Sequence, residues 1–141
     1  MTPYEDLFKR FNMATQCYDL DSIPEDDRDA FLIQLMNNAI DTSILSNSGV
    51  DLSRDDTAKQ FSSNIDTFVL QIIAEYMVHV WTGRYLYDQD LLQQYGSSSA
   101  IKVFSPASHI KTLQEVNTKS QLKAENLYKQ YSVGNSLSKL S

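Results

Sequence analysis

The sequence predicts an all-α protein: a small helical bundle with a central apolar helix and a long C-terminal helix that ends in an extended tail. Three observations favour this class. The 141 residues include only four Gly and three Pro, which is few for a turn-rich β protein. Capping residues followed by Pro mark helix starts at Thr2-Pro3 and Ser105-Pro106. Residues 68–81 are apolar at most positions, which is typical of a helix at the centre of a bundle.

The first two helices are predicted from their caps and their apolar periods. Residues 2–5 form a capping-box pattern, and apolar side chains then recur every three or four residues up to Phe11. We expect this helix to end within residues 13–16. A similar start at residues 22–25 opens a second helix, whose two adjoining apolar stripes suit packing on two neighbours. It is expected to stop before Gly49, because glycine can adopt a positive φ there.

The middle of the chain is predicted as a loop followed by the central helix. Residues 50–64 are polar and aperiodic, so we expect a loop with at most one short turn. The central helix begins near Asp66; its β-branched content makes a strand the rival, but the length of the run favours a helix. A short helix at residues 88–95, ended by Gly96, precedes a flexible loop. The predicted core residues are Phe31, Leu35, Phe68, Ile72, Met77, Val80 and Trp81.

The last helix, residues 105–132, is too long to fit inside its own domain. A helix of about 27 residues is roughly 40 Å long, whereas a compact chain of this length is about 37 Å across. Its apolar positions are sparse. It therefore either projects, with its far end packed on another chain, or kinks near Asn117 and folds back. We divide the single domain into a helical body, residues 1–104, and a C-terminal helix with a partner-docking tail, residues 105–141.

Charge is distributed unevenly along the chain. The net charge of −6 argues against a generic nucleic-acid binder, which needs a basic surface. Residues 1–66 carry 13 acidic and 5 basic side chains, a balance of −8, whereas residues 96–141 carry six Lys and two Glu, a balance of +4. Such a molecule complements copies of itself placed side by side, which steers association and register. A solvated helix face explains the Lys and Glu residues equally well.

No catalytic, cofactor-binding or metal-binding pattern occurs in the sequence. Phosphate-loop, dinucleotide-binding, nucleophile-elbow and HExxH motifs are missing. His79 lies among apolar residues and is expected to be a satisfied or half-exposed core residue, and Cys17 a buried or inert thiol. The acidic residues 25–29 lack the glycine and the alternation of a calcium loop. We therefore expect no enzyme activity, no cofactor and, without an apolar run of about 18 residues, no membrane segment.

Two segments carry a family pattern. Residues 61–92 contain an I-I-A-E-x-M-V-x-x-W helix followed by a leucine-bearing stretch, and residues 104–135 open with F-S-P-A and contain Y-S-V-G-N. Together they resemble the head–tail connector (neck adaptor) proteins of tailed bacteriophages, over about the C-terminal half of the chain. Thr82-Gly83-Arg84 stands where that family commonly has Leu-x-Pro. The matching residues are Ile72, Ile73, Ala74, Glu75, Met77, Val78, Trp81, Leu91, Phe104, Ser105, Pro106, Ala107, Tyr131 and Ser132.

The resemblance implies a structural virion protein rather than an enzyme. Members of that family form a ring, commonly of twelve copies, beneath the portal protein. The ring continues the DNA channel and is the attachment platform for the next neck or tail protein. The implied partners are therefore the portal, neighbouring copies and that next protein, while DNA passes through without specific binding. The implied location is the neck of the virion, after assembly in the host cytoplasm.

The same resemblance suggests roles for particular residues. An arm from about residue 124 to residue 140 is expected to grip the portal and to become ordered on docking. Its candidate anchors are Leu127, Tyr128, Tyr131, Val133, Leu137 and Leu140. Acidic residues that could face the channel and repel DNA are Asp19, Asp21, Asp26, Asp27, Asp51, Asp55 and Asp56. The alternatives are a tail-completion protein on the tail side of the neck, or a small acidic cytosolic regulator or inhibitor that acts by protein–protein binding.

Overall fold

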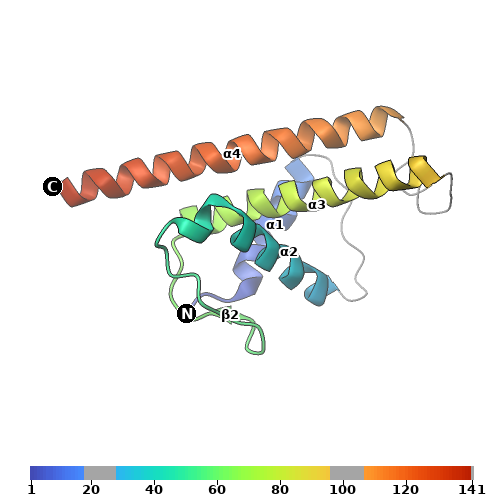
Figure 1. Cartoon of the computed structure of the whole chain (residues 1–141). Coiled ribbons are helices and arrows are strands. Elements are labelled where there is room, and N and C mark those ends of the chain that lie inside the picture. The colour runs from blue at the N-terminus through green and yellow to red at the C-terminus, as the bar shows by residue number, and fades with distance from the viewer. Residues whose placement is uncertain (18–27, 96–106, 141) are drawn as a thin grey trace.

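A computed structural model describes residues 1–17, 28–95 and 107–140 of the chain. Four helices account for most of them (Figure 1). They are α1 (Tyr4–Cys17), α2 (Arg28–Thr42), α3 (Thr67–Tyr95) and α4 (Ala107–Leu140). The short elements between α2 and α3 are the 3₁₀ helix η1 (Ile44–Asn47) and the strands β1 (Arg54–Asp55) and β2 (Gln60–Phe61). The prediction of an all-α small bundle is confirmed.

Helix α3 is the centre of the bundle and contacts α1, α2 and α4. Buried side chains occupy nearly every position from Val69 to Val78, as expected for a helix covered on several sides. On the α1 side, the ring of Trp81 meets Phe11 edge-on with centroids 5.9 Å apart. Of the predicted core residues, Leu35, Ile72, Met77 and Trp81 are buried, whereas Phe31, Phe68 and Val80 are half-buried and pack against the core.

The N-terminus of the chain is tied to the β1–β2 hairpin. The Phe61 amide donates to the Thr2 carbonyl at 2.7 Å, and the Tyr4 amide donates to the Lys59 carbonyl at 2.9 Å. The rings of Tyr4 and Phe61 then pack edge-on, with centroids 5.2 Å apart. The expectation of a loop at residues 50–64 is therefore wrong in part. The hairpin was not visible as a pattern because each strand has only two residues and Phe61 is the one fully buried side chain within them.

Two helix boundaries differ from the predictions. The short helix expected at residues 88–95 is the continuation of α3, and α4 reaches Leu140 where an extended tail was expected after residue 132. A single glycine costs a helix only about 1 kcal/mol, so Gly83 and Gly134 are tolerated inside α3 and α4. Helix α4 runs on through Asn117 instead of folding back on itself (Figure 1).

The remaining boundaries are close to those expected. Helix α1 ends at Cys17, one residue later than predicted. Helix α2 ends at Thr42, before the stop expected at Gly49; η1 follows it, and Gly49 takes the expected positive φ, 78°. The helix starts expected at residues 22–25 and at Ser105-Pro106, and the loop expected at residues 96–104, lie outside the described residues.

Candidate partner-binding surface

Helix α4 packs on α3 through one face that runs from Leu113 to Tyr131. Its buried members are Leu113, Val116, Ser120 and Ala124, and Leu127, Tyr128 and Tyr131 are partly buried against the core. Tyr131 stacks on Phe68 with centroids 6.3 Å apart. Because Phe68 lies in the first turn of α3, the support that α3 gives to α4 ends at this contact.

The candidate arm is therefore shorter than the sequence suggested. Leu127, Tyr128 and Tyr131 pack on the chain's own bundle, so the expectation that the segment from residue 124 becomes ordered only on docking is wrong for residues 124–131. The physical reason is that these apolar side chains share the face that already covers α3. Whether any of them also contacts a partner stays a prediction.

The last part of α4 extends beyond α3. Residues 132–140 add about 13 Å of helix after the Phe68–Tyr131 contact. In Figure 1 the C-terminal end of α4 runs well past the start of α3, and no other helix or strand of the described residues accompanies it. Val133 is 57% exposed on this segment. The backbone of Leu137 and Leu140 lies on it, whereas their side chains are outside the description. This projecting end, residues 132–140, is the candidate partner-binding surface.

A buried ion pair helps to fix α4 on α3. The Glu75 side chain is only 1% exposed, and the Lys123 ammonium of α4 lies 3.1 Å from its Oε1 atom, with the lysine half exposed. The Gln71 amide donates to the same oxygen at 3.4 Å, and Arg10 of α1 donates to Gln71 at 3.3 Å. A carboxylate inside an apolar helix is costly unless it is paired, so this polar chain accounts for Glu75 in the core.

A second polar contact joins the two helices about one turn further along. The Nδ1 atom of His79 lies 2.9 Å from the Asn117 carbonyl oxygen, and the Asn117 side-chain amide donates to the His79 carbonyl at 2.7 Å and to Thr82 Oγ1 at 3.1 Å. A Cβ atom on Gly83 would lie 3.3 Å from that amide nitrogen, so glycine provides the room. His79 is half-buried with a structural partner, as predicted. Each side chain binds the backbone of the other helix, which selects one register.

The Glu75–Lys123 pair and the His79–Asn117 contact together form a polar seam between α3 and α4. The sequence did not predict this seam, although two signals pointed to it. Glu75 interrupts an otherwise apolar run, and Asn117 and Ser120 interrupt the apolar stripe of the last helix. These polar residues face each other's helices instead of solvent. A charged or amide residue within a buried stripe predicts a polar partner on the facing helix, because such groups are seldom buried unpaired.

Asp51 and Asp55, two of the acidic residues predicted to face a DNA channel, stabilise the β1–β2 hairpin through hydrogen bonds. Ser53 and Ser63 donate hydroxyl hydrogen bonds of 2.7 Å to the Asp51 carboxylate. These bonds, with one from the Ser53 amide, stabilise the charged form and lower the pKa of Asp51 to about 2. The Asp55 carboxylate accepts two backbone amides at 3.0 Å in the turn between the strands. Asp51 and Asp55 thus have structural roles, whatever else they face.

Asp56 has a partner of a different kind. Its carboxylate accepts a 2.6 Å hydrogen bond from the hydroxyl of Tyr4 and a long one, 3.5 Å, from the amide of Asn37. Burial of the Tyr4 ring, together with this carboxylate, raises the pKa of the Tyr4 hydroxyl well above its usual range. The other acidic candidates, Asp19, Asp21, Asp26 and Asp27, lie outside the described residues.

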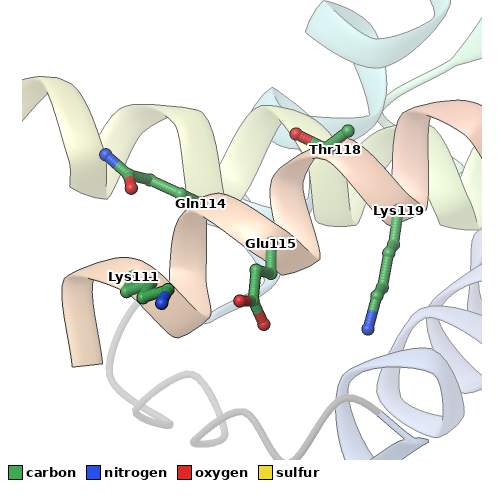
Figure 2. Close-up of a pocket in the computed structure, with 5 residues that line it drawn as sticks. All are labelled: Lys111, Gln114, Glu115, Thr118 and Lys119. Atoms are coloured by element: carbon green, nitrogen blue, oxygen red, sulfur yellow. The ribbon is translucent and has the colours of Figure 1, made fainter. Parts of the chain in front are cut away.

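An open hollow of about 410 Å³ lies along the solvent side of α4 (Figure 2). Its lining residues are Lys111, Gln114, Glu115, Thr118 and Lys119. All are exposed, and their charges are mixed, so the hollow has no feature that selects one ligand. Among the described residues no group of three His, Cys, Asp or Glu could hold a metal ion, and no helix is long and apolar enough to cross a membrane. Cys17 was expected to be a buried or an inert thiol; it is exposed, so the first of these alternatives is wrong.

No protein-family model, curated protein or solved structure matches the chain. The resemblance to head–tail connectors therefore stays a prediction.

Proposed function

We propose that this protein is a head–tail connector adaptor of a tailed bacteriophage, located in the neck of the virion. It forms a ring beneath the portal, continues the DNA channel and offers a platform to the next neck or tail protein. The observation that carries this proposal is the projecting end, residues 132–140, which continues as a helix past the contact of Tyr131 with the first turn of α3. A helix that outruns its own domain is suited to insertion into a groove on another protein.

The polar seam supports the same role. Glu75–Lys123 and the His79–Asn117 contact hold α4 in one register on α3. The projecting end is consequently presented in a defined direction, and a partner does not have to order the whole helix on binding. Preorganisation of this kind lowers the entropy cost of association.

The charge distribution supports assembly into a ring. Helix α4 carries five Lys residues against two Glu, while residues 1–66 have a balance of −8. In a ring, each interface joins two different surfaces of neighbouring copies and closes by rotation. A basic α4 set against the acidic body of the next copy gives such an interface opposite charges on its two sides.

The test is a truncation that ends the chain at Ser132. Because the packing on α3 ends at Tyr131, the shortened protein should keep the thermal midpoint of the full chain but lose binding to rings of the cognate portal, measured by co-sedimentation. A matched pair of point variants refines the result. Val133→Ser should weaken portal binding, whereas Met13→Ser, which removes an apolar side chain of similar exposure (66%), should not.

Two outcomes would contradict the proposal. Undiminished portal binding by the truncated chain would show that the projecting end is not the contact. Density for the protein on the tail side of the neck, in cryo-EM of whole particles, would favour the tail-completion alternative instead.

A further inference from the structure

We propose that the solvent-facing side of α4 forms an antiparallel contact with α4 of a second copy, centred on Leu122. This contact involves a different surface from the projecting end, and it does not depend on the contact with the portal. It occupies the outer face of α4 that the proposed ring sets against the next copy, so one copy cannot make both contacts at once. Its evidence is an exposed leucine in the middle of a helix and the order of the charges on either side of it.

The outer face of α4 is defined by its position opposite the packed face. At 3.6 residues per turn, Leu122 points about 180° away from the buried Leu113 and from Tyr131, which stacks on Phe68 of α3. Leu122 is 53% exposed, whereas Ala124, two residues on, is fully buried. Glu115 and Lys129 are seven residues before and after Leu122, so they lie on the same outer face and are exposed.

Two opposite charges on this face are placed symmetrically about Leu122, whereas Lys111, on the same face, has the uncharged Val133 at its mirror position. Glu115 lies seven residues before the leucine and Lys129 seven after it; Lys119 lies three before and Glu125 three after. Two antiparallel helices that cross at Leu122 place each residue at the height of the residue equally far on the other side. Glu115 of one copy then meets Lys129 of the other, and this pairing occurs twice by symmetry. Lys119 and Glu125 lie about 60° to either side of Leu122, so they flank the contact and do not pair across it.

A parallel pairing of the same faces is disfavoured. It would set Glu115 beside Glu115 and Lys129 beside Lys129, so that both pairs repel. The charge pattern thus selects the antiparallel arrangement and identifies a second copy of this chain as the partner, because the face is complementary to itself. Figure 2 shows Glu115 and Lys119 extending from the same side of α4.

A solvated helix explains only part of this pattern. Glu115 with Lys119, and Glu125 with Lys129, are spaced four residues apart and could support the helix alone. Within the described residues, however, the ion pairs of the structure engage none of these four side chains. The intrahelical explanation also leaves Leu122 exposed without a reason. A two-helix contact is smaller than the roughly 1,000 Å² of a stable interface, so the dimer forms reversibly and weakens as salt rises.

A charge-reversal cycle on the full chain tests the contact. Sedimentation velocity over a concentration series should show a monomer–dimer equilibrium at low salt. Glu115→Lys and Lys129→Glu, each alone, set like charges against each other and should raise the dimer dissociation constant at least tenfold. The double variant E115K/K129E, and an equimolar mixture of the two single variants, should both restore dimer formation. Glu5→Lys is the control, with the same charge change on an exposed site of α1.

The rescue distinguishes this contact from effects within one chain. Residues 115 and 129 are about 21 Å apart along the same helix, so they cannot touch in a monomer. A chain that stays monomeric at several hundred micromolar, or single variants that are not rescued in combination, would overturn the proposal. A ring-sized species whose formation is unaffected by the single and double variants at residues 115 and 129 would also overturn it, while leaving the connector proposal intact.

Discussion

Helix α3 has two interfaces of opposite character. Towards α1 it presents aromatic and aliphatic side chains, and Trp81 packs against Phe11. Towards α4 it presents Glu75, His79 and Thr82, each of which is linked to a polar group of α4 by an ion pair or hydrogen bond. Burial of apolar surface is favourable in any register, so the α1 side stabilises the bundle without selecting one alignment. The polar contacts on the α4 side form only when their partners meet at fixed positions.

This difference suits the tasks of the two neighbouring helices. Helix α1 ends within the bundle, and a small shift along α3 would change little beyond the core. Helix α4 ends outside it, so one turn of slippage would move the projecting end by about 5.4 Å. A seam with specific polar partners opposes such slippage, since a shift would leave the buried Glu75 carboxylate without its lysine.

The largest expected effect is on the apolar interface. Trp81→Ala removes a buried indole that packs on Phe11 and should lower the free energy of unfolding by about 3–5 kcal/mol. Urea denaturation followed by circular dichroism measures this change. Leu122→Ala on the outer face of α4 is the control, and should stay within about 0.5 kcal/mol of the wild type at a concentration where the chain is monomeric. A near-neutral Trp81→Ala variant would contradict the central position of α3.

The next effect is on the polar interface. Lys123→Met keeps the methylene stem but removes the cation, and should cost about 1–3 kcal/mol, less than for a fully buried pair because Lys123 is half exposed. The double variant Glu75→Met/Lys123→Met should recover most of that loss, since no buried carboxylate remains. Lys119→Met, on the solvent side, should be neutral. Equal losses in the Lys123 single and double variants would show that the ion pair does not set the stability of this seam.

The sequence was sufficient to predict the apolar interface but not the polar one. Caps and periods located α1, α2 and α3, because burial of one helix face leaves a repeat of three to four residues. The partner of Glu75 could not be found in the same way, since Lys123 is 48 residues away and resembles any solvated lysine. The contact of Asn117 with Gly83 depends on how closely two backbones approach, which no periodicity encodes.

The ends of the helices were harder still to predict. Neither Gly83 nor Gly134 stops a helix here, because packing on one side and continuous backbone hydrogen bonding outweigh the intrinsic cost of one glycine. For the candidate site, the sequence indicated that the last helix outruns the body. It did not show that Tyr131, one of the proposed anchors, would instead stack on Phe68.

The smallest expected effect, and the most specific, concerns the close approach at Gly83. Alanine is normally the better helix former by about 1 kcal/mol, but here its Cβ atom would lie 3.3 Å from an Asn117 amide held by two hydrogen bonds. Gly83→Ala should therefore be neutral or slightly destabilising in the wild type, yet stabilising by up to about 1 kcal/mol in an Asn117→Ala background. The coupling free energy from this double-mutant cycle, measured by thermal unfolding, reports the contact directly. Gly134→Ala is the control, because open space surrounds a Cβ atom there. The same stabilisation by Gly83→Ala in both backgrounds would mean that the two helices are not held at this distance in solution.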